Sequence, residues 1–314
     1  MSTGKQLSIA LAAVLVIGAT GTMLLTRSHP HHHPHSHPDP AESPSVAAPV
    51  HRAVIRKHTN QYLGIITKPA LAPEPLKANI GEFYTSFTSS FPARLASGYR
   101  QRGMVPFIQV NPRGIDLANI AAGKFDDALR SYALQARNFR TKLIYSFGHE
   151  MNCANWYSWC LPRTKPAVFV AAWRHIHLIF NQEHASNVLW AWDPNIVVPH
   201  SYGLKLWWPG AKFVDLVGID GYMRHPKDTF DSVFGRTIRE VRSLTTDPII
   251  LAEVAVPPGP HRPAKIREIF SGIRRYHLQG MVWFDIPALQ NYRIDSDPAA
   301  IAAIKRGASQ SSRQ

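Results

Sequence analysis

The sequence predicts a closed (β/α)₈ TIM barrel, preceded by an N-terminal membrane-anchor helix and a disordered linker. Eight short apolar segments recur from residue 63 onward, and longer amphipathic segments separate most of them. Apolar strands linked by helices indicate a parallel sheet that is buried on both faces. Eight such units over roughly 250 residues match the usual size of a closed barrel.

An open, doubly wound sheet is the alternative arrangement of the same elements. In its dinucleotide-binding form, a glycine-rich phosphate fingerprint follows the first strand. No such fingerprint follows residues 63–67 of this chain. The closed barrel is therefore the favoured fold, and we expect it to work without a cofactor.

The expected strands share an apolar core and a polar side chain at or just after the C-terminal end. They cover Leu63–Thr67, Ile80–Thr85, Val105–Val110, Leu143–Phe147, Val188–Trp192, Leu216–Ile219, Ile249–Ala252 and Met281–Phe284. The expected helices share an amphipathic pattern and lie around Ala93–Gln101, Phe125–Phe139, Val168–Gln182, Phe230–Leu244 and Ala264–His277.

The N-terminal segment is built like a membrane anchor. Residues 7–25 contain no charged side chain and lie between Lys5 and Arg27. This length suits a membrane-spanning helix and exceeds the usual apolar region of a signal peptide. We expect residues 1–27 to form an uncleaved signal anchor; the alternative is a signal peptide cleaved near the small residues 19–21. Either one exports the rest of the chain, so the protein is expected to be extracytoplasmic, membrane-anchored or secreted.

Residues 28–55 predict a linker, because they are rich in proline and histidine and lack an apolar period. Six histidines between His29 and His37 could bind divalent metal loosely, but nothing fixes their geometry, so we expect a hydrated spacer and no specific metal site. The barrel domain is expected to cover residues 56–308, and a short tail residues 309–314.

The chain is basic, with a formal net charge of +14, but its lysines and arginines are scattered. A scattered distribution is typical of a solvated surface, and we expect no nucleic-acid partner.

Two glutamates are the candidate catalytic residues. Glu150 follows the fourth expected strand and Glu253 follows the apolar run of the seventh. The chemistry of such barrels lies at the C-terminal ends of the strands, and strands four and seven face each other across the barrel. Two carboxylates that flank one bond are what glycoside hydrolysis requires: one donates a proton to the leaving oxygen, and the other attacks or activates water. Alternatively, either carboxylate could cap a helix or pair with a basic side chain.

The residues around Glu150 carry a specific resemblance. Gly148-His-Glu-Met-Asn152, followed by Trp156-Tyr-Ser-Trp159, resembles the acid/base motif of glycoside hydrolase family 26, the retaining β-mannanase family. Further segments that resemble the family are Gly123–Leu129, Trp190–Asn195, Val214–Tyr222, Ile250–Glu253 and Val282–Phe284, so the likeness spans roughly residues 60–290.

The resemblance implies a role for each matching residue. Glu150 would be the general acid/base and Glu253 the nucleophile. His149 would contact the sugar or orient the surroundings of Glu253, and Tyr222 would hydrogen-bond the nucleophile. The remaining expected substrate-binding residues, in the same subsite or stacked on sugar faces, are Asn152, Trp156, Asp220 and Trp283. Trp283 could instead fill the barrel, and Asp220 could be a structural cap.

The chain departs from the family in the loop after Glu150. Cys153 and Cys160 stand where the family usually has glycine, and Trp156 lies one residue further from Glu150 than is common. They are the only two cysteines in the sequence, and in an exported domain they are expected to form a disulfide. A zinc site or a cysteine nucleophile is the less favoured alternative, since no ligand set is spaced for metal.

The sequence therefore predicts a retaining endo-β-glycanase whose partner is a polysaccharide, with β-1,4-mannan as the expected substrate. Two other hypotheses stay open: lichenase or xylanase activity with the same residues, and a catalytically silent glycan-binding barrel tethered to the envelope.

Overall fold

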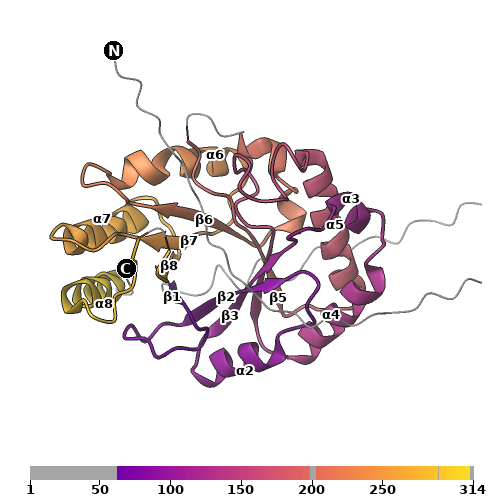
Figure 1. The fold of residues 1–314 in the computed structure, drawn as a ribbon, viewed down its shortest axis with the longest axis horizontal. Coiled ribbons are helices and arrows are strands. Elements are labelled where there is room, and N and C mark those ends of the chain that lie inside the picture. The colour runs from indigo at the N-terminus through magenta and orange to yellow at the C-terminus, as the bar shows by residue number, and fades with distance from the viewer. Residues whose placement is uncertain (1–61, 199–202, 289, 312–314) are drawn as a thin grey trace, which may run out of the picture.

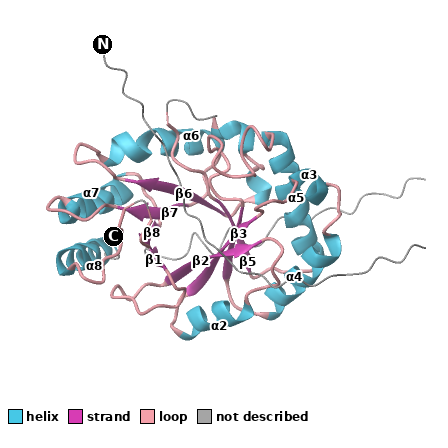
Figure 2. Ribbon diagram, in the orientation of Figure 1, coloured by secondary structure: helices cyan, strands magenta, loops and turns pink. Residues whose placement is uncertain are grey.

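The computed structural model describes residues 62–198, 203–288 and 290–311 and shows a closed barrel of eight parallel strands in the order β1 to β8 (Figure 1). Strand β1 pairs with β8 from Tyr62 opposite Gly280 to Thr67 opposite Asp285, and this pairing closes the sheet. Helices surround the strands (Figure 2). The predicted fold is thus confirmed for the barrel, whereas the expected anchor and linker lie outside the described residues.

The eight strands agree with the prediction to within three residues at either end. Their bounds are Tyr62–Thr67 (β1), Ile80–Ser86 (β2), Val105–Asn111 (β3), Leu143–Phe147 (β4), Val188–Trp192 (β5), Leu216–Tyr222 (β6), Ile249–Ala255 (β7) and Gly280–Asp285 (β8). Every residue of β4, β5, β7 and β8 is buried, as expected for a sheet covered on both faces.

The helices in the described residues include all five that the sequence predicts. Their bounds are Ala93–Gln101 (α2), Leu117–Ala121 (α3), Asp126–Asn138 (α4), Pro166–Gln182 (α5), Arg236–Leu244 (α6), Arg262–Arg275 (α7) and Pro298–Ser311 (α8). Short 3₁₀ turns cover Leu204–Trp207 (η1) and Ala211–Phe213 (η2). The segment predicted as one helix from Phe230 begins with a π-helical turn, Asp231–Gly235 (η3), before α6.

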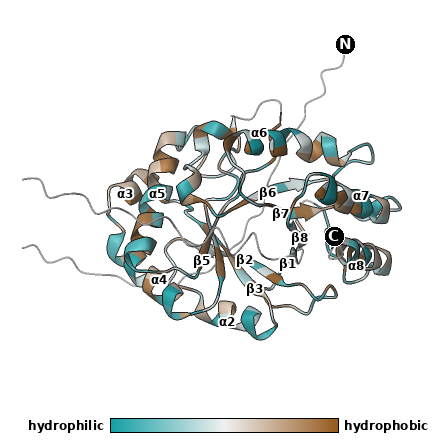
Figure 3. Cartoon of the chain, turned by 180° about the vertical axis from the view of Figure 1, so that it is seen from behind, coloured by the Kyte–Doolittle hydropathy of each residue, from teal (hydrophilic) through white to brown (hydrophobic). Residues whose placement is uncertain are grey.

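Local chemistry explains where several helices begin. Helix α5 starts with Pro166, whose missing N–H is no loss in a first turn. Asp126 and Asp127 lie in the first turn of α4, where acidic side chains stabilise the helix dipole. In Figure 3 hydrophobic residues concentrate on the central strands, while hydrophilic residues lie on the helices around them, α2 and α4 among them.

The prediction missed α3 and α8. Helix α3 is only five residues long, too short for a periodic signal. Helix α8 packs against α7, and Gly307 lets the ring of Phe270 approach its backbone. It continues to Ser311, so it enters the segment predicted as a tail. No helix in the described ranges is long and apolar enough to cross a membrane.

Candidate active site

Glu150 lies on a sharp turn directly after β4. Gly148 and Glu150 both adopt left-handed backbone conformations, with φ of 61° and 52°. This conformation is unusual for a residue with a side chain and is found where surrounding contacts enforce it. Here the Glu150 N–H donates to the carbonyl of Asp193, just after β5, at 2.7 Å. The turn therefore ties the Glu150 backbone to the neighbouring strand.

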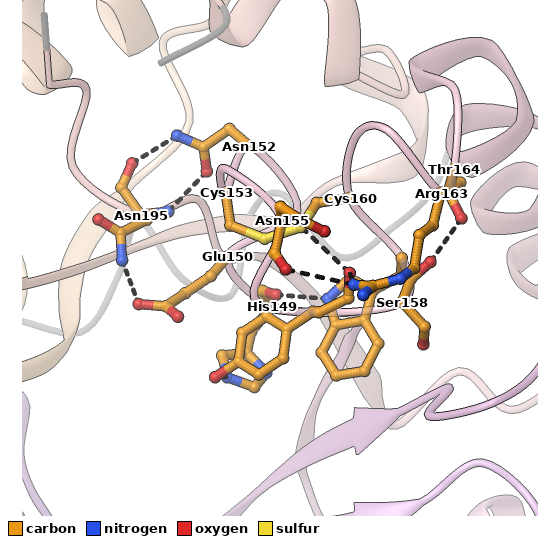
Figure 4. Close-up of a disulfide and its surroundings, with 12 residues drawn as sticks. His149, Glu150, Asn152, Cys153, Asn155, Ser158, Cys160, Arg163, Thr164 and Asn195 are labelled. Carbon is orange, nitrogen blue, oxygen red and sulfur yellow. Dashed lines mark hydrogen bonds between the residues drawn. A yellow bond between two sulfur atoms is a disulfide. The ribbon is translucent and has the colours of Figure 1, made fainter. Parts of the chain in front are cut away.

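A pair of asparagines fixes the Glu150 side chain. The amide of Asn195 donates to Oε1 of Glu150 (Figure 4). Asn152 in turn holds the backbone of Asn195: its Nδ2 donates to the Asn195 carbonyl at 2.9 Å, and its Oδ1 accepts from the Asn195 N–H at 2.8 Å. Both polar atoms of Asn152 are thus engaged by the protein, which makes it a positioning residue rather than an open sugar contact.

Glu253 lies in the middle of β7, flanked by two irregularities in strand pairing. The register shifts between β6 and β7 near Asp220 and between β7 and β8 beyond Leu251. Such bulges re-aim side chains next to active sites. Tyr84 donates a hydrogen bond to Oε1 of Glu253, and Tyr222 donates one to Oε2. Both carboxylate oxygens are therefore held by phenols from opposite sides, on β2 and β6.

The two glutamates differ in how readily they ionise. Burial, followed by the negative charge of Glu253, raises the pKa of Glu150 to about 8. Burial also raises the pKa of Glu253, but the hydrogen bonds from Tyr222 and Tyr84 counteract that rise because they favour the ionised form. Near neutral pH this environment keeps the proton on Glu150 and the charge on Glu253. The influence of Glu253 on Glu150 also shows that the two side chains share one site.

His149 is a buried, neutral imidazole. Its Nδ1 lies 2.9 Å from Oδ1 of Asn111 and its Nε2 3.3 Å from the hydroxyl of Tyr157. With the asparagine oxygen as acceptor, Nδ1 carries the proton and Nε2 accepts from the tyrosine. Burial, assisted by the charge of Arg113, lowers the pKa of His149 to about 3. His149 therefore acts as a polar spacer in the wall of the site and holds no charge.

The loop after Glu150 is closed by a disulfide between Cys153 and Cys160, as predicted (Figure 4). Inside the loop, Trp159 is fully buried and donates from Nε1 to the carbonyl of His149 at 2.8 Å. The ring of Tyr157 stacks on Trp159 with centroids 4.3 Å apart. The loop thus supports the strand tip that carries His149 and Glu150. Trp156, the predicted stacking residue, is only partly buried.

The other two predicted substrate contacts lie deeper in the site. Trp283 on β8 has no exposed surface; its Nε1 donates to the Tyr292 carbonyl at 3.2 Å, and Arg262 lies 5.5 Å from its ring. A sugar can contact this ring only after a neighbouring side chain moves. Asp220 lies opposite Glu253 in the strand register, and both of its buried carboxylate oxygens lack a hydrogen-bond partner. Burial, and after it the charge of Glu253, raises the pKa of Asp220.

Tyr84 and Tyr157 are site residues that the sequence pattern did not predict. Tyr84 lies within an ordinary strand pattern, and only barrel closure through β8 and β1 lets its hydroxyl reach Glu253 on β7. Tyr157 lies inside the aromatic motif, between tryptophans that are the more usual sugar-stacking residues. Asn195 ends a segment that resembles the family, but no role was predicted for it. Within the described ranges, no group of three or more His, Cys, Asp or Glu side chains is arranged to hold a metal ion.

A closed (β/α)₈ barrel with two buried glutamates, one just after β4 and one on β7, is the architecture of a glycoside hydrolase. Residues 120–254 match the family model described as glycosyl hydrolase family 26.

Two proteins of known name are similar in sequence to parts of this chain. Endoglucanase H of Acetivibrio thermocellus is 28% identical over 225 residues, which are 67% of this chain and 25% of that protein. Mannan endo-1,4-beta-mannosidase A and B of Caldalkalibacillus mannanilyticus is 28% identical over 116 residues, 35% of this chain and 21% of that protein. The chain therefore spans about a quarter of the length of the curated relatives it matches.

Among solved structures, the catalytic domain of an endo-beta-1,4-mannanase from Bacillus sp. JAMB-750 superposes with a TM-score of 0.59. The two sequences are 13% identical, and the match covers 81% of this chain and 86% of that one. At this identity the likeness establishes the shared barrel fold.

Proposed function

We propose that this protein is a retaining endo-β-glycanase that hydrolyses β-1,4-linked mannan by double displacement. The observation that carries the proposal is the pair of buried glutamates, Glu150 after β4 with its pKa raised to about 8 and Glu253 on β7 with two tyrosine hydrogen bonds that favour its ionised form. Pairs of carboxylates whose surroundings separate their pKa values are the signature of an acid and a nucleophile. The match to the family model and the mannan-degrading names among the similar proteins support the choice of substrate.

In the first step, the protonated Glu150 donates its proton to the glycosidic oxygen while a carboxylate oxygen of Glu253 attacks the anomeric carbon. The bond from carbon to the leaving oxygen breaks, and a covalent glycosyl–Glu253 intermediate forms. In the second step, the ionised Glu150 takes a proton from water, whose oxygen displaces Glu253. Tyr84 and Tyr222 orient the nucleophile for both steps, since each donates to one of its oxygens.

The remaining residues shape the site around the reacting sugar. Both carboxylate oxygens of Asp220 lack a partner and are suited to hydrogen-bond hydroxyl groups of the substrate, while His149 lines the wall of the site beside Glu150. Trp156 offers an aromatic face to a further sugar unit, and the buried Trp283 packs behind the side chains that line the site. Asn152 and Asn195 keep Glu150 in place.

A second candidate function follows from the name of one relative. Because Endoglucanase H matches over more of this chain than the mannosidase does, β-glucan is the alternative substrate of the same two glutamates. β-Xylan completes the set of polymers to be compared. A glycan-binding barrel without catalysis is the remaining hypothesis.

We also propose a location for the enzyme. Residues 7–25 would anchor it in a membrane and residues 28–55 would space the barrel from it, on the extracytoplasmic side. The Cys153–Cys160 disulfide supports an oxidising compartment. Cell fractionation of the full chain should place it in the membrane fraction, and removal of residues 1–27 should release it. Recovery of a soluble protein that lacks the N-terminal segment would show a cleaved signal peptide instead.

Hydrolysis of a polysaccharide panel tests the proposal. The wild-type protein should release reducing ends from β-1,4-mannan faster than from β-glucan or β-xylan. Glu253→Ala should abolish hydrolysis while binding of mannan persists, because the nucleophile is lost and the rest of the site remains. If the wild-type protein cleaves none of the three polymers but binds one of them, the chain is a glycan-binding barrel.

A further inference from the structure

Two more carboxylates lie buried within the barrel beside the catalytic pair. Glu82 on β2 and Asp193, which follows β5, are both fully buried. One amide joins them: Nε2 of Gln109 on β3 lies 3.0 Å from Oε1 of Glu82 and 2.7 Å from Oδ2 of Asp193. Glu82, Gln109 and Asp193 have no part in the two reaction steps carried by Glu150 and Glu253.

Among the described residues, no basic side chain balances these two carboxylates. In the described part of the chain, neither Glu82 nor Asp193 belongs to a salt bridge with Lys, Arg or His. Two further acidic side chains, Glu253 on β7 and Asp220 on β6, lie close enough to interact with Glu82 electrostatically. A buried carboxylate without a counter-charge takes up a proton, because desolvation disfavours the ionised form.

The hydrogen bonds indicate which of the two takes the proton. Each carboxylate has one oxygen without a partner, Oε2 of Glu82 and Oδ1 of Asp193, but Asp193 receives the shorter bond from Gln109 and Glu82 the longer one. Burial, followed by the charges of Glu253 and Asp193, raises the pKa of Glu82 well above its usual value. Burial raises the pKa of Asp193 to about 7, and the bond from Gln109 counteracts it. The proton therefore belongs on Glu82.

This group also touches the supports of both catalytic glutamates. Glu82 stands two residues before Tyr84 on the same strand, and Tyr84 donates to Glu253. Asp193 accepts the Glu150 N–H through its backbone carbonyl. A displacement of Glu82, Gln109 or Asp193 would therefore reach both partners of the reaction.

We propose that Glu82 is a positioning residue that stays a neutral carboxylic acid and, through Gln109 and Asp193, fixes the floor of the catalytic site. As a neutral group it adds no negative charge next to Glu253, so the nucleophile can ionise. The protonated state of Glu82 is inferred from its full burial, its weaker hydrogen bond and its raised pKa, and its effect on rate rests on the proposed hydrolase function.

Infrared spectroscopy tests the proton without any substrate. At neutral pH the wild-type protein should show the C=O stretch of a protonated carboxyl group, and the Glu82→Gln variant should lose that band. Glu150 and Asp220, whose pKa values are also raised, contribute to the same region, so the comparison is made within the Glu150→Gln, Asp220→Asn background. Asp127→Asn, at an exposed position of α4, is the control and should leave the band unchanged. If the band is the same with and without Glu82→Gln in this background, the proposal is overturned.

The pH dependence of kcat/KM tests the positioning role. Glu82→Gln replaces a neutral acid by a neutral amide of the same shape, so both limbs of the profile should stay in place. Glu82→Ala removes the bond to Gln109 and should lower kcat roughly 10-fold or more with little change in KM, as expected when positioning is lost. If Glu82 were ionised, Glu82→Gln would remove a negative charge and move the acidic limb to lower pH, which contradicts the proposal. An inactive wild type with the predicted infrared result would reject the hydrolase function and keep the protonated Glu82.

Discussion

The hydroxyl of Tyr84 holds one oxygen of Glu253, and its removal should be visible in the kinetics. Tyr84→Phe should lower kcat/KM roughly 10- to 100-fold, the range of a lost hydrogen bond to a charged group. It should also raise the pKa of Glu253, because that bond favours the ionised form. The acidic limb of the pH profile then moves to higher pH.

Tyr222→Phe should act in the same direction, since Tyr222 donates to the other oxygen. The matched control is Tyr99→Phe, which removes a phenol hydroxyl that accepts from the Leu71 N–H, away from the nucleophile. A Tyr84→Phe profile that coincides with the Tyr99→Phe profile would show that Tyr84 does not act on Glu253.

The pH profile of the wild type follows from the same two residues. Glu150 must hold its proton to act as the acid, so kcat/KM should fall as the pH rises through about 8. Glu253 must be ionised, so activity should also fall at low pH, with a midpoint above 4.5 because burial raises its pKa. A rate that stays constant from pH 7 to pH 10 would contradict the assignment of Glu150.

Glu150 should lower the stability of the fold that it serves. Its pKa rises from 4.5 to about 8 on folding, so the folded protein binds a proton that the unfolded chain has lost between these values. The contribution of the protonated Glu150 to the free energy of unfolding is fully present below about pH 4.5 and is lost as the pH rises through about 8.

Glu150→Gln removes this penalty, and at pH 7 it should raise the free energy of unfolding on the order of 2 kcal/mol. Denaturant unfolding at pH 4 and at pH 7 provides the measurement. An equal effect of the substitution at both pH values would contradict the raised pKa.

Part of the site could be predicted from the sequence at the level of residues. Glu150 and Glu253 follow strongly apolar runs, so the pattern of the chain alone predicts their position at strand ends. Tyr84 could not be found in this way, because its neighbour Glu253 is 169 residues away and a tyrosine in a strand is ordinary. The engagement of Asn152 by the Asn195 backbone depends on a loop conformation that no periodic pattern encodes.

At the scale of elements, the loop from Cys153 to Cys160 supports the acid/base strand tip. Loss of the disulfide in a Cys153→Ser, Cys160→Ser double variant should lower the free energy of unfolding by roughly 2–3 kcal/mol, the size expected for a short closed loop. It should also lower kcat, since Trp159 and Tyr157 then hold His149 less firmly.

Both effects are measured on three samples: the double variant, the reduced wild type and the oxidised wild type. Denaturant unfolding gives the free energy of unfolding of each, and mannan hydrolysis gives its kcat. Arg163→Ala is the control within the same loop, because it removes bonds to the Asn155 and Tyr157 carbonyls and keeps the disulfide. Full activity of the double variant would show that the loop is not needed to position the site.

The strands were predicted more accurately than the helices, and the reason is physical. All eight strands form one buried sheet, so each is an apolar run with sharp ends. The helices are only half buried, and their ends depend on caps and contacts with neighbours. Helix α8 is mostly small residues whose burial against α7 becomes evident only in the fold.

At the scale of the whole molecule, barrel closure is what creates the site. It brings Tyr84, Glu150, Tyr222 and Glu253 from four different strands or strand tips to one end of the sheet. The order and parallel direction of the strands were predictable, and with them the opposition of β4 and β7. The identity of the polymer is a matter of loop shape and of sugar contacts such as Trp156, which the strand pattern does not determine.

Anomer-resolved NMR of the first products from β-1,4-mannan tests the central claim most directly. Double displacement at Glu253 with Glu150 as the acid predicts that the new reducing ends appear first as the β-anomer and then equilibrate with the α-anomer. Early appearance of the α-anomer would mean inversion through a water-mediated single displacement, and it would contradict the assignment of Glu253 as the nucleophile.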